Sequence, residues 1–324
     1  MKHISKITAI ALLATLSACD GSDMPIQQAD NHGYISFSAQ PQKTATRANP
    51  YEAYDPTRHP ATMGTFGYYD MPKRYASAAN TIFNNETATY NVATYGWDTA
   101  TKKRWTEYTK ASSFDFFAYM PYTGGAALLR TANNTYTLSF PFAMSDGGNP
   151  VPVIYDTKAA PIICTVPSNK GAISDSNGGG TVSLKFDQTL TGYKLLFMLG
   201  TKMNAIRHFR IKSVTLSGSF STSCTISRSY VWNTTSKSWS ASAITWSDIK
   251  RQSFVETPFP IAYKGYGSAD YDDNTQTVIV TSVGYTQWGA DIYTIPDAKF
   301  LPVINVKYCL LYTSPSPRDT ERSR

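Results

Sequence analysis

The clearest pattern in the chain is an alternation of apolar and polar side chains from Tyr34 to Ala39. Ile35, Phe37 and Ala39 fall on one face of an extended segment, and the tyrosine and serines between them fall on the other. A period of two residues is typical of a β-strand that buries one face. The pattern therefore predicts a half-buried strand near the start of the chain.

Short segments rich in aromatic or β-branched residues follow at regular spacing, and turn residues such as glycine, asparagine and proline separate them. Strands of this length and spacing are typical of β-sandwiches rather than of βαβ units. We therefore predict an all-β fold. The further predicted strands are 65–69, 88–93, 105–108, 114–119, 136–140, 182–187, 193–199, 211–216, 219–226, 277–283 and 301–308.

Polar stretches suggest how the chain is divided. Residues 19–33 have no apolar period, which is typical of a flexible tether. Residues 168–180 are polar and end in a run of glycines, so they are the best candidate for a boundary between domains. We expect an N-terminal domain over 48–176 and a C-terminal domain over 177–308.

The beginning of the chain has the order of a secretion signal. A basic start is followed by an apolar run, Ile7 to Leu16, that is too short to remain as a membrane-spanning helix. Leu16-Ser17-Ala18-Cys19 fits the lipobox of bacterial lipoproteins, which predicts a signal peptide over 1–18 and acylation of Cys19. The alternative is an ordinary signal peptide with a cysteine there by chance. Long acyl chains would hold such a protein on a membrane.

The C-terminal end departs from the pattern before it. After Tyr308 the alternation stops, and Cys309 to Asp319 resembles the translation of a sequencing adapter. We therefore expect 309–324 to be an artefact, the natural protein to continue beyond Tyr308, and the C-terminal domain to be incomplete here. A genuine disordered tail is the alternative.

Composition and charge exclude few classes of protein, but they argue against a nucleic-acid-binding protein. The chain has 324 residues, of which 42% are hydrophobic and 16% charged, with a formal net charge of +7. The basic cluster Lys102-Lys103-Arg104 lies between predicted strands and is interpreted as a solvated hairpin loop. Nucleic-acid binding would need a longer basic stripe with stacking aromatics. We expect no nucleic-acid partner.

Motifs for catalysis or cofactor binding are missing from the sequence. Asp270 to Asn274 resembles the start of a calcium loop, but Thr275 stands where glycine is needed and no glutamate closes the loop. Neither a nucleophile elbow nor a cysteine–histidine arrangement is legible, so we expect no enzyme, cofactor or metal site. The four histidines lack metal-ligand spacing; they are His3, His32, His59 and His208.

Two groups of residues leave alternatives open. Cys164 and Cys224 could form a disulfide in an oxidising compartment or remain packed thiols. Trp232, Trp239 and Trp246 could stack on sugars, but in a β-rich chain they are more often core or cross-strand partners.

Taken in order, several segments resemble the fimbrillin superfamily, the lipoprotein precursors of type V pili. The lipobox and the alternating strand come first, and the remaining segments are less specific one by one. They are Thr46-Arg47-Ala48, Phe66-Gly67-Tyr68-Tyr69, Asn84-Asn85 through Trp97 and Trp105, Phe114 to Tyr119 with Pro121, Phe186 to Leu190, Ile295-Pro296 and Ile304 to Tyr308. Gln188 stands where many members have histidine. The resemblance implies two transthyretin-like β-sandwich domains in tandem.

The resemblance also implies an assembly mechanism. The precursor would be anchored to the outer membrane through Cys19, and 19–47 would be a propeptide that carries the strand Tyr34 to Ala39. An arginine-specific protease would cut after Arg47, which makes Ala48 the new N-terminus and releases that strand. A strand from a related pilin subunit would fill the vacancy, and repetition would build a pilus at the cell surface.

Two other functions remain open from the residues. The first alternative is a non-polymerising surface lipoprotein that adheres to a glycan or a host protein. The second is a secreted hydrolase, which only scattered acidic residues and exposed aromatic residues suggest.

Overall fold

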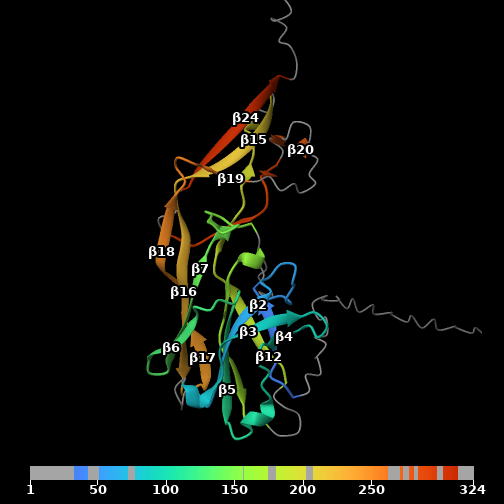
Figure 1. Cartoon of the computed structure of the whole chain (residues 1–324). Helices are drawn as coiled ribbons and strands as arrows, with labels where there is room; N and C mark the ends of the chain where they lie inside the picture. Colours follow the sequence, from blue (N-terminus) through green and yellow to red (C-terminus); the bar gives the residue numbers. More distant parts are fainter. Residues whose placement is uncertain are drawn as a thin grey trace, which may run out of the picture.

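The computed structural model of the chain describes residues 33–42, 51–71, 77–155, 157–173, 180–201, 207–261, 271–272, 277–280, 284–297 and 302–312. Within these residues the secondary structure is almost entirely β-strand. The molecule is elongated, with β2, β3, β4 and β12 in one half and β15, β19 and β24 in the other (Figure 1). Two separate hydrophobic cores correspond to these halves.

The first half is built around an eight-stranded sheet in the order β10-β12-β1-β4-β3-β2-β5-β11. Strand β10 also pairs with β5, so hydrogen bonding returns to its starting point and the sheet closes on itself. Closure removes the free edges of the strands in the ring. The strands are β1 (Phe37–Pro41), β2 (Thr62–Tyr69), β3 (Thr81–Asn91), β4 (Gly96–Thr99), β5 (Ser113–Met120), β10 (Ile162–Cys164), β11 (Ser168–Gly171) and β12 (Val182–Gln188).

A second sheet packs against the outer face of β5. Phe117 lies edge-on to Tyr230 at a centroid distance of 5.4 Å, and Tyr119 stacks on Phe140 at 4.5 Å. The alternate residue Phe116 faces the interior of the closed sheet, so β5 is buried on both faces. This sheet has the order β17-β16-β7-β6, with β18 also on β16. Its strands are β6 (Ala127–Ala132), β7 (Thr135–Ala143), β16 (Ser219–Asn233), β17 (Ser238–Ala241) and β18 (Thr245–Ser253).

The second half is a five-stranded sheet in the order β19-β15-β21-β20, with β24 paired along β15. Its core includes Ile211, Val214, Val278 and Trp288. The strands are β15 (Arg207–Ser217), β19 (Phe259–Ile261), β20 (Tyr271–Asp272), β21 (Thr277–Val280) and β24 (Val303–Tyr312). Shorter elements are β8 (Ser145–Asp146) with β9 (Asn149–Pro150), β13 (Thr191–Tyr193) with β23 (Ile292–Thr294), β14 (Leu196–Phe197) with β22 (Thr286–Gln287), and the 3-10 turns Ala78–Asn80, Trp105–Tyr108 and Thr157–Ala159.

The all-β fold class with cores in tandem is confirmed. The first half is a sandwich in which the closed sheet and the β16 sheet enclose one core. The predicted boundary between 176 and 177 stays a prediction, since 174–179 lie outside the described residues. The sheets themselves extend across that position, because β12 pairs with β1 and β16 pairs with β7.

Several local predictions differ from the structure. The predicted strand 34–39 is displaced to Phe37–Pro41, and the predicted strand 193–199 is divided between β13 and β14. The segment 105–108 was expected to be a strand but forms a 3-10 turn, because the Arg104 N–H donates to the Glu107 carboxylate at 2.9 Å and holds the turn. The Trp105 indole is thereby placed in the core, edge-on to Phe114 at 5.3 Å. Strand β24 extends to Tyr312, past the predicted end at Tyr308, because its main chain continues to pair with β15. The adapter origin of 309–324 stays a prediction.

A buried carboxyl group connects the two sheets of the first half. The Asp115 Oδ1 atom accepts hydrogen bonds from Trp239 Nε1 at 2.7 Å and from Asn169 Nδ2 at 2.6 Å. Its Oδ2 atom is buried without a hydrogen-bond partner. Burial raises the pKa of Asp115 from 3.8 to about 6, while the two donors oppose that rise.

This pKa shift makes stability depend on pH with a definite sign. Because the folded pKa of Asp115 lies above its value of 3.8 in the unfolded chain, its contribution is fully present below about pH 4 and is lost as pH rises through 6. Asp115→Asn removes this pH dependence. As pH rises through this window, the free energy of unfolding of the variant should therefore increase relative to that of wild type by on the order of 3 kcal/mol. Urea unfolding of both proteins at pH 4 and pH 7.5 measures this change. The same difference in unfolding free energy between variant and wild type at both pH values would contradict the raised pKa of Asp115.

Candidate functional site

The first described strand occupies an interior position in the closed sheet. Strand β1 pairs in parallel with β12 from Phe37 opposite Val182 to Pro41 opposite Phe186. On its other side it pairs with β4 at Phe37 opposite Trp97. The predicted strand is therefore flanked by strands on both sides, and the closed sheet is incomplete without it.

The predicted alternation of β1 is present in three dimensions. Ile35, Phe37 and Ala39 are 3%, 0% and 5% exposed, so all three belong to the first core. The Phe37 ring lies edge-on to Phe83 at 5.8 Å and to Phe116 at 5.6 Å, and edge-to-face pairs of this kind are a favoured aromatic geometry. Burial of these side chains contributes roughly 1.5–3 kcal/mol each for Ile35 and Phe37.

The beginning of β1 is held by the basic segment that the sequence analysis interpreted as a solvated loop. The Ile35 N–H donates to the Lys103 carbonyl at 2.8 Å, and the Trp105 N–H donates to the Gly33 carbonyl at 3.0 Å. The Arg104 guanidinium lies 4.7 Å from the centre of the Tyr34 ring and donates to its hydroxyl at 2.8 Å. No local pattern in the sequence indicates that Tyr34 and this segment meet.

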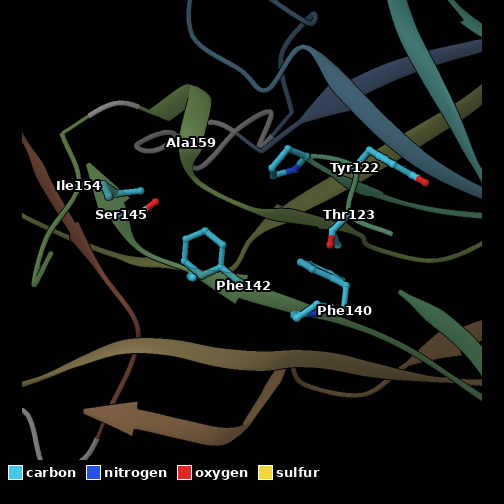
Figure 2. Close-up of a pocket in the computed structure, with 10 residues that line it drawn as sticks. Tyr122, Thr123, Phe140, Phe142, Ser145, Ile154 and Ala159 are labelled. Atoms are coloured by element: carbon cyan, nitrogen blue, oxygen red, sulfur yellow. The ribbon is translucent and has the colours of Figure 1, made fainter. Parts of the chain in front are cut away.

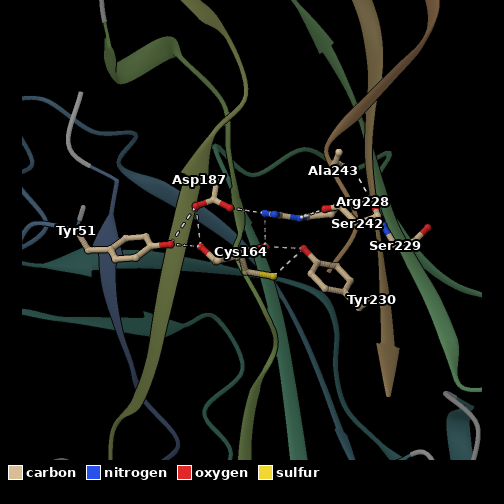
Figure 3. Close-up of polar contacts among 9 residues, drawn as sticks. Tyr51, Cys164, Asp187, Arg228, Ser229, Tyr230, Ser242 and Ala243 are labelled. Atoms are coloured by element: carbon tan, nitrogen blue, oxygen red, sulfur yellow. Dashed lines mark hydrogen bonds and ion pairs between the residues drawn. The ribbon is translucent and has the colours of Figure 1, made fainter. Parts of the chain in front are cut away.

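The end of β1 is held by a segment that sequence reasoning did not single out. Gln42 forms an antiparallel bridge with Tyr51, and the Glu52 N–H donates to the Pro41 carbonyl at 2.9 Å. The Tyr51 hydroxyl lies 3.2 Å from Asp187 Oδ1 and 3.1 Å from Thr165 Oγ1 (Figure 3). Burial is the main cause that raises the pKa of Tyr51 above 10.0.

Asp187 is itself fixed by its neighbours, so it is a rigid acceptor for Tyr51. Thr165 Oγ1 donates to Asp187 Oδ1 at 2.9 Å, and Arg228 forms an ion pair with the other carboxylate oxygen. The Arg228 Nε atom also donates to the Ser242 carbonyl at 2.9 Å (Figure 3). We call Tyr51, Thr165, Asp187 and Arg228 the Tyr51 cluster. It joins β12 to β16 and therefore connects the two sheets next to β1.

The predicted lipidation and processing residues lie outside the described residues. These are Cys19, Arg47 and Ala48, and their roles stay predictions. The described residues lie on both sides of the predicted cut. Gln42 on one side and Tyr51 on the other face each other across the bridge.

A pocket of about 240 Å³ lies beside β7 and is lined in part by Pro121, which follows a cis peptide bond (Figure 2). Its lining is aromatic, aliphatic and hydroxyl-bearing, and it contains no charged side chain. The lining residues are Pro121, Tyr122, Thr123, Phe140, Pro141, Phe142, Ala143, Ser145, Ile154 and Ala159.

The described cysteines are thiols, and no metal site is visible in the same part of the chain. Cys164 and Cys224 are both buried and free, and burial raises the pKa of Cys164 to about 11 and of Cys224 to about 12. The described residues contain no group of three histidine, cysteine or acidic side chains arranged to hold a metal ion. Among the same residues, no helix has the length and apolar character needed to cross a membrane.

Comparison with known proteins gives structural likeness at low sequence identity. A fimbrial protein from Bacteroides vulgatus matches 86% of this chain and 84% of its own, with 14% identity and a TM-score of 0.49. A candidate cell adhesion protein from Bacteroides ovatus matches 86% and 85%, with 12% identity and a TM-score of 0.42. A fimbrial protein from Bacteroides ovatus matches 87% and 46%, with 11% identity and a TM-score of 0.37. No protein-family model and no curated protein matches the chain.

The burial of Phe37 leads to a stability prediction. Phe37→Ala removes a fully buried ring from the closed sheet and should lower the free energy of unfolding by about 3–5 kcal/mol. Leu129→Ala is the matched control, because Leu129 is 61% exposed and its truncation should change that free energy by less than about 0.5 kcal/mol. Urea denaturation followed by tryptophan fluorescence measures both. Equal effects of the two variants would show that β1 does not belong to the stable core.

Proposed function

We propose that this chain is a structural subunit of a cell-surface pilus, exported as a lipoprotein and polymerised by strand exchange. In this proposal Cys19 carries the lipid that anchors the precursor to the outer membrane. A protease cuts after Arg47, Ala48 becomes the new N-terminus, and residues 19–47 leave with β1. The observation that carries the proposal is the position of β1: an N-terminal strand that completes a closed sheet between β12 and β4.

Departure of β1 would leave a site suited to another strand. The main-chain groups of β12 that pair with Phe37 to Pro41 would lose their partners. Unpaired strand edges are templates for pairing with another chain. The places of Ile35, Phe37 and Ala39 would become apolar sites that select side chains at alternate positions. The vacancy would therefore bind an extended strand with the same alternation.

The geometry of such a contact favours a filament. The vacancy lies in the first half of the molecule, and a strand donated from another part of a second copy makes a head-to-tail contact. Contacts of this type do not close on themselves unless a rotation brings the ends together, so each added copy leaves a further site open. The partners would be like or related pilin subunits.

Limited proteolysis tests the proposal. The purified chain is treated with an arginine-specific protease, and the products are analysed by N-terminal sequencing and by electrophoresis in SDS without heating. We expect a new N-terminus at Ala48, together with SDS-resistant oligomers when a related subunit is supplied as donor. A β1 peptide (residues 33–42) should instead fill the vacancy and give a complex of one subunit with one peptide. The Arg47→Ala variant should keep its N-terminal segment and should form neither product.

Two outcomes would contradict the proposal. The first is an N-terminus that stays intact under conditions in which exposed arginines elsewhere are cut. The second is cleavage at Arg47 after which the chain remains monomeric and binds no donor peptide. A monomer that instead binds glycans in an array would favour the adhesin alternative.

A further inference from the structure

The two sides of β1 are not equally paired. β12 accompanies the whole strand, whereas the pairing with β4 consists of Phe37 opposite Trp97. At the far end of β1 the second side is closed by the bridge from Gln42 to Tyr51 and by the hydrogen bond from Glu52 to Pro41. The segment Tyr51–Glu52 therefore takes over the flanking role after β4 has diverged.

The side chain of Tyr51 attaches this flanking segment to β12, the principal partner of β1. Its hydroxyl reaches Asp187 and Thr165, and its ring lies 5.2 Å from the Lys185 ammonium group. Lys185 and Asp187 both belong to β12. These contacts do not involve the side chains of β1, so they would remain when β1 is cut from the chain.

We propose that Tyr51 is a latch that controls how fast β1 leaves after proteolysis. The inference rests on the proposed function, because it concerns the same strand and the same cut. Cleavage after Arg47 places Gln42 on the departing segment and Tyr51 on the body of the subunit. The cut breaks a peptide bond elsewhere in the chain, so the bridge between Gln42 and Tyr51 survives it. Cleavage and strand departure are therefore two separate steps, and the Tyr51 cluster sets the rate of the second.

The expected size of the effect follows from the chemistry of the contact. A hydrogen bond from a phenol to a fixed carboxylate is stronger than a neutral one, and its loss at an opening strand end should raise the departure rate about tenfold. Tyr51→Phe removes the hydroxyl and keeps the ring beside Lys185. Tyr54→Phe is the matched control, because the Tyr54 hydroxyl donates to the Pro60 carbonyl at 2.9 Å.

The latch can be tested first in the uncut chain, without reliance on the proposed function. Hydrogen–deuterium exchange is measured at the Gln42 and Glu52 amides, which donate to the Phe186 and Pro41 carbonyls. We expect Tyr51→Phe to accelerate exchange at both amides about tenfold, and Tyr54→Phe to match wild type. Equal exchange in wild type and Tyr51→Phe would overturn the proposal.

The second measurement follows departure itself. After cleavage by an arginine-specific protease, the N-terminal fragment is displaced by an excess of labelled β1 peptide (residues 33–42), and the release rate is measured. We expect faster release from Tyr51→Phe and an unchanged rate from Tyr54→Phe. Release at the same rate from wild type and Tyr51→Phe would overturn the latch and leave the proposed function standing. Fragment retention in every protein after complete cleavage would contradict the proposed function, and the exchange data would still decide on the latch.

Discussion

The parallel pairing of β1 with β12 is the interaction on which the first half of the molecule depends. The paired residues Phe37 and Val182 are far apart in the sequence, yet their strands are direct neighbours in the sheet. Pairing over such a separation has a high entropic cost of loop closure, and the burial of Phe37 in the core offsets part of it. Without β1 the ring of strands is open between β12 and β4, and each of these two strands has a free edge.

Closure of the sheet explains how one strand could serve both stability and, in the proposed function, assembly. The bonds that hold β1 are mostly main-chain bonds, which carry little sequence information, and the alternating side chains provide the selectivity. A strand with apolar side chains of similar size at the places of Ile35, Phe37 and Ala39 would restore similar contacts. Exchange of one such strand for another leaves the hydrogen bonds and the buried area nearly unchanged. The difference in binding free energy between β1 and an incoming strand would therefore be small compared with the free energy that holds each of them in the sheet.

The sequence was informative where a local period decides the structure and uninformative where distant segments meet. The alternation at Ile35 and Phe37 predicted both the strand and its buried face, because a period of two has one common cause. Asp115 follows Phe114 in β5 and would be expected to face solvent, but β5 is covered on both faces and its carboxyl group is buried. Which sheet covers a strand is a property of topology, and no local pattern encodes it.

The same limit applies to the residues around β1. Tyr51 lies in a proline-rich stretch without a period, and its partner Asp187 is 136 residues away. The sequence predicts that Lys103 is part of a solvated loop, because three adjacent basic residues favour water. Its role in pairing belongs to its backbone carbonyl rather than to its charge. Backbone partners leave almost no trace in a sequence, since every residue except proline offers the same groups.

The unequal flanks of β1 also bear on how the proposed exchange would begin. At its beginning, the main chain is bonded to the Lys103 segment, and the Arg104 guanidinium covers the Tyr34 ring. At its end, next to the proposed cut, β4 has already diverged, and the flank consists of the short segment held by Tyr51. In the proposed mechanism the cut frees the chain just beyond Gln42, so opening would begin at Gln42 and proceed towards Ile35. An incoming strand would then meet the vacancy first at the β12 residues beside the Tyr51 cluster, and it could pair there before the buried ring of Phe37 has left the core.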